Sequence, residues 1–246
     1  LLAALLAYLE ATGEASRVSS GTFLTSMIDF SDPGDLGVFI DHEQVESLEQ
    51  KMAKGGYLDG SDMATTFNML RSNDLIWSFV INNYLMGEEP PVFDLLYWNS
   101  DSTRMPARMH SEYLRTMYLE NRFKEPGGMT LAGVPIDISS VKTPCYFLST
   151  QDDHIAPWRS TFAGAGLFKG PVRFVLSGSG HIAGVVNPPE AGKYGYWTSR
   201  SRPRGDADAW QAKASAQTGS WWPDWQKWAV KFTGTRVKAR QTGAKK

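Results

Sequence analysis

Apolar and polar residues alternate along the chain with a spacing that changes from one region to the next. Residues 1–14, LLAALLAYLEATGE, are rich in Leu and Ala and end in Thr-Gly, which predicts a core helix followed by a stop signal. Residues 18–30, VSSGTFLTSMIDF, are rich in β-branched and aromatic residues and run into Asp-Pro-Gly, which predicts a buried strand before a turn. A helix followed by a strand favours an α/β fold.

The pattern differs between residues 31 and 135. Stretches such as DHEQVESLEQKMAKGG and MHSEYLRTMYLENRF place apolar residues at helical spacing, and no convincing strand is visible for roughly a hundred residues, too many for a crossover connection. We therefore expect a helical cap subdomain over residues 31–135, inserted in a core formed by residues 1–30 and 136–232.

Strand-like patterns return after the cap. Residues 143–150, TPCYFLST, and 172–176, VRFVL, are apolar, and a helix-compatible stretch lies between them. Strand, helix and strand in this order predict a mostly parallel sheet with helices on its faces. Tryptophans 221, 222, 225 and 228 predict a terminal helix that docks on the core, in preference to a ligand cage. The basic residues 233–246 are expected to be a disordered tail.

Composition and charge exclude several classes of function. The chain has 25 Lys and Arg against 26 Asp and Glu, so it offers no broad positive field, and we expect no nucleic-acid partner. The single cysteine, Cys145, excludes an internal disulfide and suits a reducing cytosol. The first apolar run is too short for a transmembrane segment and lacks the basic residues of a signal peptide.

Acidic and basic side chains follow the two strands predicted after the cap. Asp152, Asp153 and His154 follow the first strand, and His181, in SGSGHIAG, follows the second. An Asp with a His about thirty residues later is the order of an α/β-hydrolase triad, in which the carboxylate orients the imidazole. A solvent-facing turn is the alternative, and adjacent Asp153 and His154 are not expected to serve one site together. Four histidines without a Glu-x-x-His pair argue against a metal site.

The nucleophile of such a triad is missing from the sequence. No G-x-S-x-G motif or cysteine equivalent occurs, and Cys145 lies inside a predicted strand, where burial would raise its pKa and hide it from substrate. Because the chain begins without Met inside a helix, we expect the nucleophile elbow and the N-terminal strands to lie upstream of Leu1. Without those upstream strands, a hydrophobic strand edge would be open to pairing, so we expect the isolated chain to be prone to aggregation.

Five motifs in order resemble the C-terminal catalytic region of class I polyhydroxyalkanoate synthases, which polymerise 3-hydroxybutyrate units. The resemblance covers the chain from Leu1 to about Trp228. The motifs are RSNDLIWSFVINNYL, FDLLYWNSDSTRMP, DDHIAPW, SGSGHIAGVVNPP and GSWWPDW. The resemblance implies an α/β-hydrolase core with a helical cap. It also implies polymerisation of (R)-3-hydroxyacyl-CoA, mainly 3-hydroxybutyryl-CoA, with release of CoA by a Cys-His-Asp acyltransferase mechanism.

The resemblance also assigns roles to individual residues. Asp153 matches the catalytic aspartate and His181 the general base, while the cysteine would stand upstream of Leu1, so the chain itself is not expected to turn over. Asp94 and Trp98 are expected to be structural residues of the cap. Four further positions are expected to bind substrate or support the site: Asp29, Arg71, Asn121 and His154.

The same resemblance implies partners and a location. No cofactor or metal is expected, because the CoA thioester is the substrate. The implied partners are the acyl-CoA and the growing polyester chain or granule, with homodimerisation through the cap and a cytoplasmic location at polyester granules. Two alternatives stay open. One is an esterase or polyester depolymerase of the same fold, which a serine elbow would indicate. The other is a non-catalytic module that binds granules or a partner and uses the aromatic cap and the Trp-rich helix as an adhesive surface.

Overall fold

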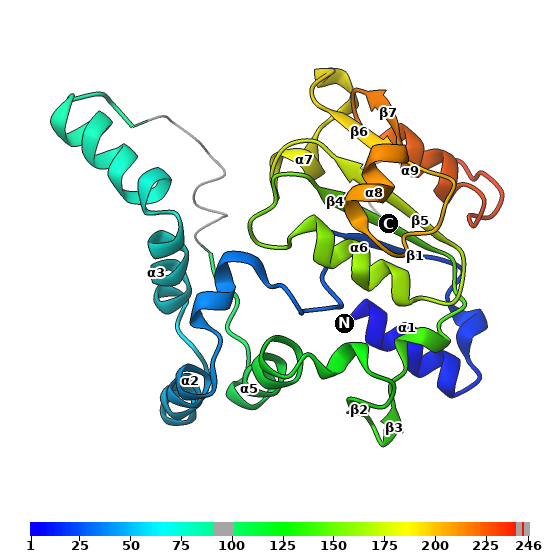
Figure 1. Ribbon diagram of the computed structural model, residues 1–246, viewed down its shortest axis with the longest axis horizontal. Coiled ribbons are helices and arrows are strands. Elements are labelled where there is room, and N and C mark those ends of the chain that lie inside the picture. Colours follow the sequence, from blue (N-terminus) through cyan, green and yellow to red (C-terminus); the bar gives the residue numbers. More distant parts are fainter. Residues whose placement is uncertain (91–100, 240–242, 244–246) are drawn as a thin grey trace.

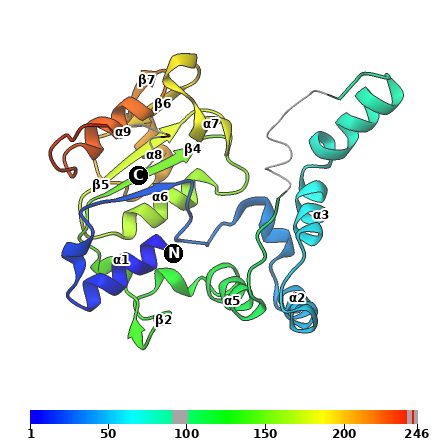
Figure 2. The same cartoon turned by 180° about the vertical axis from the view of Figure 1, so that it is seen from behind.

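The computed structural model describes residues 1–90, 101–239 and 243 of the chain. These residues form a mixed α/β structure in which helices surround a twisted sheet, while α2, α3 and α5 lie to one side of it (Figure 1). The view from behind shows the same separation (Figure 2). The predicted structural residues Asp94 and Trp98, and residues 240–242 and 244–246 of the predicted tail, lie outside the described residues. No helix of the described part is both long enough and apolar enough to cross a membrane.

The central sheet has five strands in the order β1-β4-β5-β6-β7. Their bounds are Gly21–Leu24, Cys145–Thr150, Val172–Ser177, Gly195–Thr198 and Ser215–Thr218. Strand β4 pairs in parallel with both β1 and β5, whereas β6 and β7 extend the sheet in antiparallel fashion. The mixed α/β class and its parallel strands are confirmed, and the two antiparallel strands are an addition to the predicted fold.

Strand β4 separates the two sides of the hydrophobic core. All six of its residues are buried, as expected for a parallel strand that is covered on both faces. Phe147 stacks on Phe23 of β1 with ring centroids 4.4 Å apart, in the cluster that also contains α1 (Leu2–Ala11) and α6 (Trp158–Leu167). Tyr146 faces the other cluster, which is built around buried tryptophans.

The C-terminal helix α9 (Trp222–Ala229), together with Trp221 just before it, supplies the tryptophans of that second cluster. Trp221 is completely buried, and its Nε1 donates to the carbonyl oxygens of Gly184 and Val185 at 3.1 Å each. Trp225 Nε1 donates to Thr22 Oγ1 at 3.0 Å. The indole groups therefore bind the protein itself, which confirms the predicted core-docking helix.

Helices fill the described part of the chain between β1 and residue 124. In order they are η2 (Gly34–Phe39), α2 (His42–Gly55), α3 (Gly60–Leu70), η3 (Asn73–Trp77), η4 (Val80–Leu85), α5 (Ala107–Tyr113), η5 (Leu114–Leu119) and η6 (Arg122–Lys124). The helix α2 begins at the cap Asp41, whose carboxylate accepts from Gln44 N, and it ends at Gly56 in the left-handed conformation. The helical character predicted for this region is confirmed.

One element inside the predicted helical cap is a β-hairpin and not a helix. Residues 130–135 form a short antiparallel hairpin, β2 (Thr130–Leu131) and β3 (Val134–Pro135), where no strand was predicted. Its two-residue turn has positive φ at both central residues, +47° at Ala132 and +80° at Gly133, as a tight hairpin turn requires. Two-residue strands carry too little alternation to be seen in the sequence. The remaining elements are η1 (Ala15–Arg17), η7 (Ile138–Ser140), α7 (Ala183–Val186), η8 (Pro189–Ala191) and α8 (Ala207–Lys213).

Candidate active site

The structure brings Asp153 and His181 together at the carboxyl ends of β4 and β5. The Nδ1 atom of His181 lies 2.8 Å from Oδ2 of Asp153. The Asp153 side chain is fully buried, whereas 30% of the His181 side chain is exposed. An imidazole whose Nδ1–H is held by a buried carboxylate leaves Nε2 free to accept a proton, which is the geometry of a general base.

Four donors converge on the Asp153 carboxylate. Its Oδ1 accepts from the backbone N–H groups of Ile155 at 2.9 Å and Ala156 at 2.8 Å, and its Oδ2 accepts from Thr150 Oγ1 at 3.0 Å as well as from His181. Burial opposes ionisation, but the hydrogen bonds from His181 and the backbone lower the pKa of Asp153 below its usual value. The carboxylate is therefore ionised and fixed in orientation before any ligand arrives.

Backbone contacts hold the loop of His181 against the loop of Asp153. Asp152 N donates to Ser179 O at 3.0 Å, and Ser179 itself adopts a positive φ of +72°. A Cβ at Gly184 would lie 2.5 Å from Thr150 Cγ2, so only glycine lets α7 approach the end of β4 so closely. The small residues around His181 thus serve the packing of its loop.

A cavity of about 390 Å³ borders His181. Helix α1, strand β1 and the loop after β1 form one part of its lining, and Ile155 and Ala156 another. Aromatic and apolar side chains form the part nearest the helical region: Phe30, Tyr113, Met117, Tyr118 and Phe123. The sequence predicts Tyr113, Met117 and Tyr118 as residues at helical spacing, and the family resemblance also matches Tyr113 to a cap position that could line the substrate path. Their place in the cavity depends on η5 packing beside the loop after β1.

Three of these side chains form what we call the aromatic wall: Phe30, Tyr113 and Tyr118. Phe30 packs edge-to-face against Tyr118, with centroids 4.8 Å apart, and the Tyr113 ring lies 5.6 Å from that of Tyr118. Burial raises the pKa of both tyrosines above the usual value. The wall therefore presents neutral phenol groups among apolar surfaces.

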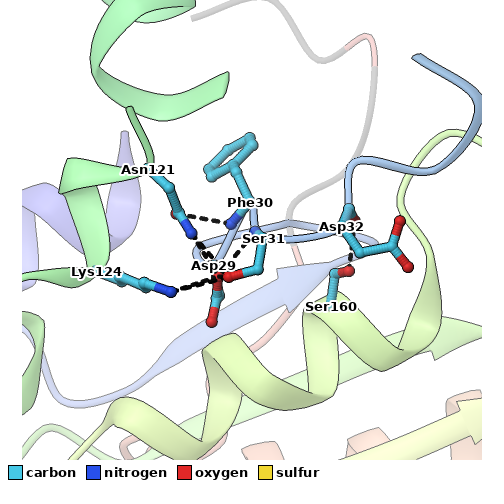
Figure 3. Close-up of polar contacts among 7 residues, drawn as sticks. All are labelled: Asp29, Phe30, Ser31, Asp32, Asn121, Lys124 and Ser160. Atoms are coloured by element: carbon cyan, nitrogen blue, oxygen red, sulfur yellow. Dashed lines mark hydrogen bonds and ion pairs between the residues drawn. The ribbon is translucent and has the colours of Figure 1, made fainter. Parts of the chain in front are cut away.

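Two residues predicted to support the site, Asp29 and Asn121, bind each other. Asn121 Nδ2 donates to Asp29 Oδ1 at 2.8 Å, and Asn121 Oδ1 accepts from the backbone N–H of Phe30 at 2.9 Å (Figure 3). Lys124, which was not predicted, lies 3.4 Å from the same Asp29 oxygen. Within the described residues, the lining of the cavity includes Phe30 but neither Asp29 nor Asn121.

The other two predicted residues, Arg71 and His154, are electrostatically linked. Burial, followed by the positive charge of Arg71, lowers the pKa of His154 below its usual value. The four donors to the Asp153 carboxylate come from other residues, while the charges of Asp153 and His181 also act on the pKa of His154.

Cys145 occupies a structural position. It is fully buried in β4, and its Sγ donates to Thr143 O at 3.2 Å. Burial raises the pKa of the thiol to about 12, so a reactive thiolate does not form there near neutral pH. Across the described residues, no group of three or more His, Cys, Asp or Glu side chains converges to hold a metal ion.

Comparison with known proteins gives close relatives of one kind. No family model matches the chain. It is 54% identical over 243 residues to the poly(3-hydroxyalkanoate) polymerase subunit PhaC of Rhizobium meliloti, covering 99% of this chain and 39% of the relative. It is 52% identical to the poly(3-hydroxyalkanoate) polymerase of Methylorubrum extorquens, covering 99% and 40%, and 43% identical to the PhaC subunit of Cupriavidus necator, covering 94% and 40%. The chain thus spans about two fifths of the length of these relatives.

Proposed function

We propose that this chain, a homologue of the poly(3-hydroxyalkanoate) polymerases, is the acid–base part of an acyltransferase that builds polyester from (R)-3-hydroxyacyl-CoA and releases CoA. The observation that carries the proposal is the pair of Asp153 and His181, 2.8 Å apart, at the edge of a cavity with an apolar wall. The names of the relatives support the substrate class. We assign the activity to the whole protein, because the chain matches only part of each relative.

In this proposal the nucleophile is a cysteine outside these 246 residues, since the thiol of Cys145 is buried. The chain on its own would then not release CoA. His181 Nε2 removes the proton from the cysteine thiol, and the thiolate attacks the carbonyl carbon of the acyl-CoA thioester. The C–S bond to CoA breaks, and the departing CoA thiolate takes the proton from His181.

Chain growth uses the same base a second time. His181 removes the proton from the hydroxyl of another 3-hydroxyacyl unit, and the resulting alkoxide attacks the carbonyl carbon of the acyl-enzyme. The ester bond forms as the bond to the cysteine sulfur breaks, and the released cysteine thiolate takes the proton back from His181. Asp153 keeps the Nδ1–H of His181 in place through both steps and stabilises the imidazolium that forms each time.

Water competes with the attacking hydroxyl. Hydrolysis of the acyl-enzyme would end a chain that should grow, so the site needs a surface that excludes water. The apolar side chains of Phe30, Met117 and Phe123 line the cavity that borders His181. They suit the exclusion of water and the binding of an aliphatic acyl group. Asp29, Asn121, Arg71 and His154 would support the site from its border.

The finer description of the fold is also part of the proposal. We assign residues 1–30 and 136–232 to an α/β-hydrolase core and residues 31–135 to its cap. The parallel pairing of β1, β4 and β5 and the position of the Asp-His pair at their carboxyl ends support this assignment. Homodimerisation through the cap and association with polyester granules in the cytoplasm complete the proposal.

The test begins with the coding sequence upstream of Leu1. A G-x-C-x-G-G box there predicts that the complete protein releases CoA from (R)-3-hydroxybutyryl-CoA and forms polymer. The variant His181→Gln should abolish the release, whereas the control His42→Gln, at an exposed position of α2, should retain it. A serine elbow with free 3-hydroxybutyrate as the product would indicate an esterase. A folded complete protein that leaves the thioester intact would refute the proposal.

A further inference from the structure

Asp29 belongs to a local pattern that occurs three times in the described chain. In Asp29–Ser31, Asp59–Ser61 and Asp137–Ser139, the aspartate Oδ1 accepts from both the N–H and the Oγ of the serine two residues later. This turn is a local property of an Asp-x-Ser sequence. Asp29 differs because the same oxygen also accepts from Asn121 and Lys124, which lie 92 and 95 residues further along the chain.

Asn121 joins the loop after β1 to the end of η5. Its Nδ2 donates to Asp29 Oδ1 at 2.8 Å and to Ser31 Oγ at 2.9 Å, while its Oδ1 accepts from Phe30 N at 2.9 Å (Figure 3). The residue has a positive φ of +49°, a conformation that asparagine tolerates better than most residues. One side chain thus holds three consecutive residues of the loop.

Helix α6 fixes the other side of this loop. Ser160 Oγ donates to Asp32 O at 2.6 Å (Figure 3). A Cβ at Gly164 would lie 2.9 Å from Ile28 Cβ, so the helix lies directly on the loop backbone. The loop is therefore anchored to the sheet layer, and the contacts of Asn121 transmit that fixed position to η5.

The fixed position matters because of what Phe30 and η5 carry. Phe30, which lies between Asp29 and Ser31, supplies one ring of the aromatic wall, and Tyr118 of η5 supplies another, with the two ring centroids 4.8 Å apart. Both line the cavity that borders His181. Asp29 and Asn121 bind this wall from outside the cavity lining, so their contribution to substrate selection can only be indirect.

We propose that Asn121, held by Asp29, which Lys124 also binds, is a positioning residue that sets the place of the aromatic wall and thereby the size of acyl group that fits beside His181. The inference rests on the proposed acyl-CoA function. It assigns acyl-chain selectivity to a polar clamp behind the cavity, in addition to the residues that line it. The three donors Asn121, Ser31 and Lys124 need an ionised acceptor, and Asp29 supplies it: burial opposes its ionisation, but these bonds lower its pKa below the usual value.

The test compares two substrates in the complete protein. Asn121→Gly keeps the left-handed backbone and removes the amide. Asp137→Ala is the matched control, since its carboxylate has the same local turn and, among the contacts of the described residues, only local partners. The readout is the ratio of kcat/KM for (R)-3-hydroxybutyryl-CoA to that for (R)-3-hydroxyhexanoyl-CoA, measured by CoA release.

We expect Asn121→Gly to change this ratio about fivefold or more, in line with the roughly 1–3 kcal/mol that one methylene is worth in an apolar pocket. Asp137→Ala should keep the ratio within about twofold of the wild type. A loss of stability at a site that is not coupled to the cavity lowers kcat/KM for both substrates by the same factor, so the ratio does not change. A folded Asn121→Gly protein with an unchanged ratio would overturn the proposal, even if its melting temperature were lower.

Two further measurements cover the other outcomes. If Asn121→Gly does not fold, Asn121→Asp keeps the acceptor for Phe30 N but places a second carboxylate against Asp29, so its ratio should return toward the wild-type value as the pH falls and one carboxyl is protonated. A ratio without that pH dependence would refute the clamp. If the wild type releases no CoA, the proposed function fails by itself, and hydrogen exchange then decides on the clamp. Faster exchange confined to 114–119 in Asn121→Gly supports it, and unchanged exchange there overturns it.

Discussion

Replacing Asp153 with asparagine should leave the protein folded and nearly abolish turnover. The asparagine Oδ1 can still accept from the backbone N–H groups of Ile155 and Ala156, which lie 2.9 and 2.8 Å from Oδ1 of Asp153. The amide nitrogen then takes the place of Oδ2, where it faces His181 Nδ1 and the Thr150 hydroxyl. Because an amide N–H cannot accept a hydrogen bond, His181 must move its proton to Nε2.

The magnitude follows from that change of tautomer. With Nε2 protonated, His181 can no longer accept the proton of a nucleophile, and the same substitution in a serine-protease triad lowers kcat about 10⁴-fold. We therefore expect a loss of about 10³ to 10⁴-fold, or roughly 4–5 kcal/mol of transition-state stabilisation. The stability cost is smaller. One charged hydrogen-bond acceptor becomes neutral, which costs about 1–2 kcal/mol.

The assay is CoA release by the complete protein, with urea unfolding as the measure of stability. Asp152→Asn is the control, because Asp152 is the adjacent carboxylate and is exposed. Since the folded-state pKa of Asp153 is lowered, its contribution to stability is present above the unfolded value of about 3.9 and is lost as the pH falls through the folded value. Asp153→Asn should reduce this acid-side loss. A variant that keeps a tenth of wild-type turnover, or an equal loss in Asp152→Asn, would refute the role of Asp153.

Three further substitutions test the packing that supports the site. Cys145→Ser should cost about 1–3 kcal/mol, because a hydroxyl replaces a fully buried thiol, yet CoA release should persist; urea unfolding and the release assay check this. Asp224→Asn should cost about 2–3 kcal/mol in the same unfolding measurement, because Arg173 Nε donates to this carboxylate at 2.6 Å in a partly buried pair, and an unchanged midpoint would contradict it. Gly164→Ala should cost about 1–3 kcal/mol, because its Cβ would lie 2.9 Å from Ile28 Cβ; calorimetry measures the shift, and a higher melting temperature would disprove the close approach.

The proximity of Asp153 and His181 could be predicted from the sequence, because each residue follows a strand whose apolar residues are continuous. The parallel register aligns Thr150 with Ser177, so the two strands end at the same edge of the sheet. Only a strand pattern and the rule for the carboxyl ends of parallel strands were needed. The antiparallel strands β6 and β7 lacked such a signal. All four residues of β7 are exposed and those of β6 are half-buried, so burial imposed no apolar pattern on them.

The clamp behind the aromatic wall could not be predicted in the same way. The local sequence of Asp29, Ile-Asp-Phe-Ser, resembles that of Asp137, Ile-Asp-Ile-Ser, and the two aspartates make the same turn, so the turn motif alone does not distinguish them. The difference comes from Asn121 and Lys124, which reach Asp29 only because the chain between them folds back to the loop after β1. A role that depends on such long-range contacts becomes visible only in the folded chain.

The two aspartates of the candidate site share one physical device. Asp153 Oδ1 accepts from the backbone N–H two residues later, Ile155, as Asp29 Oδ1 does from Ser31. In both cases the local bond fixes the carboxylate, which can still accept from a distant side chain, His181 in one case and Asn121 in the other. A carboxylate oriented by its own turn needs little reorganisation to hold that partner. The turn at Asp153 therefore orients the base, and the turn at Asp29 orients the aromatic wall beside it. Disrupting either turn should affect the site more than the number of hydrogen bonds lost would suggest, because the bonds of each network reinforce one another.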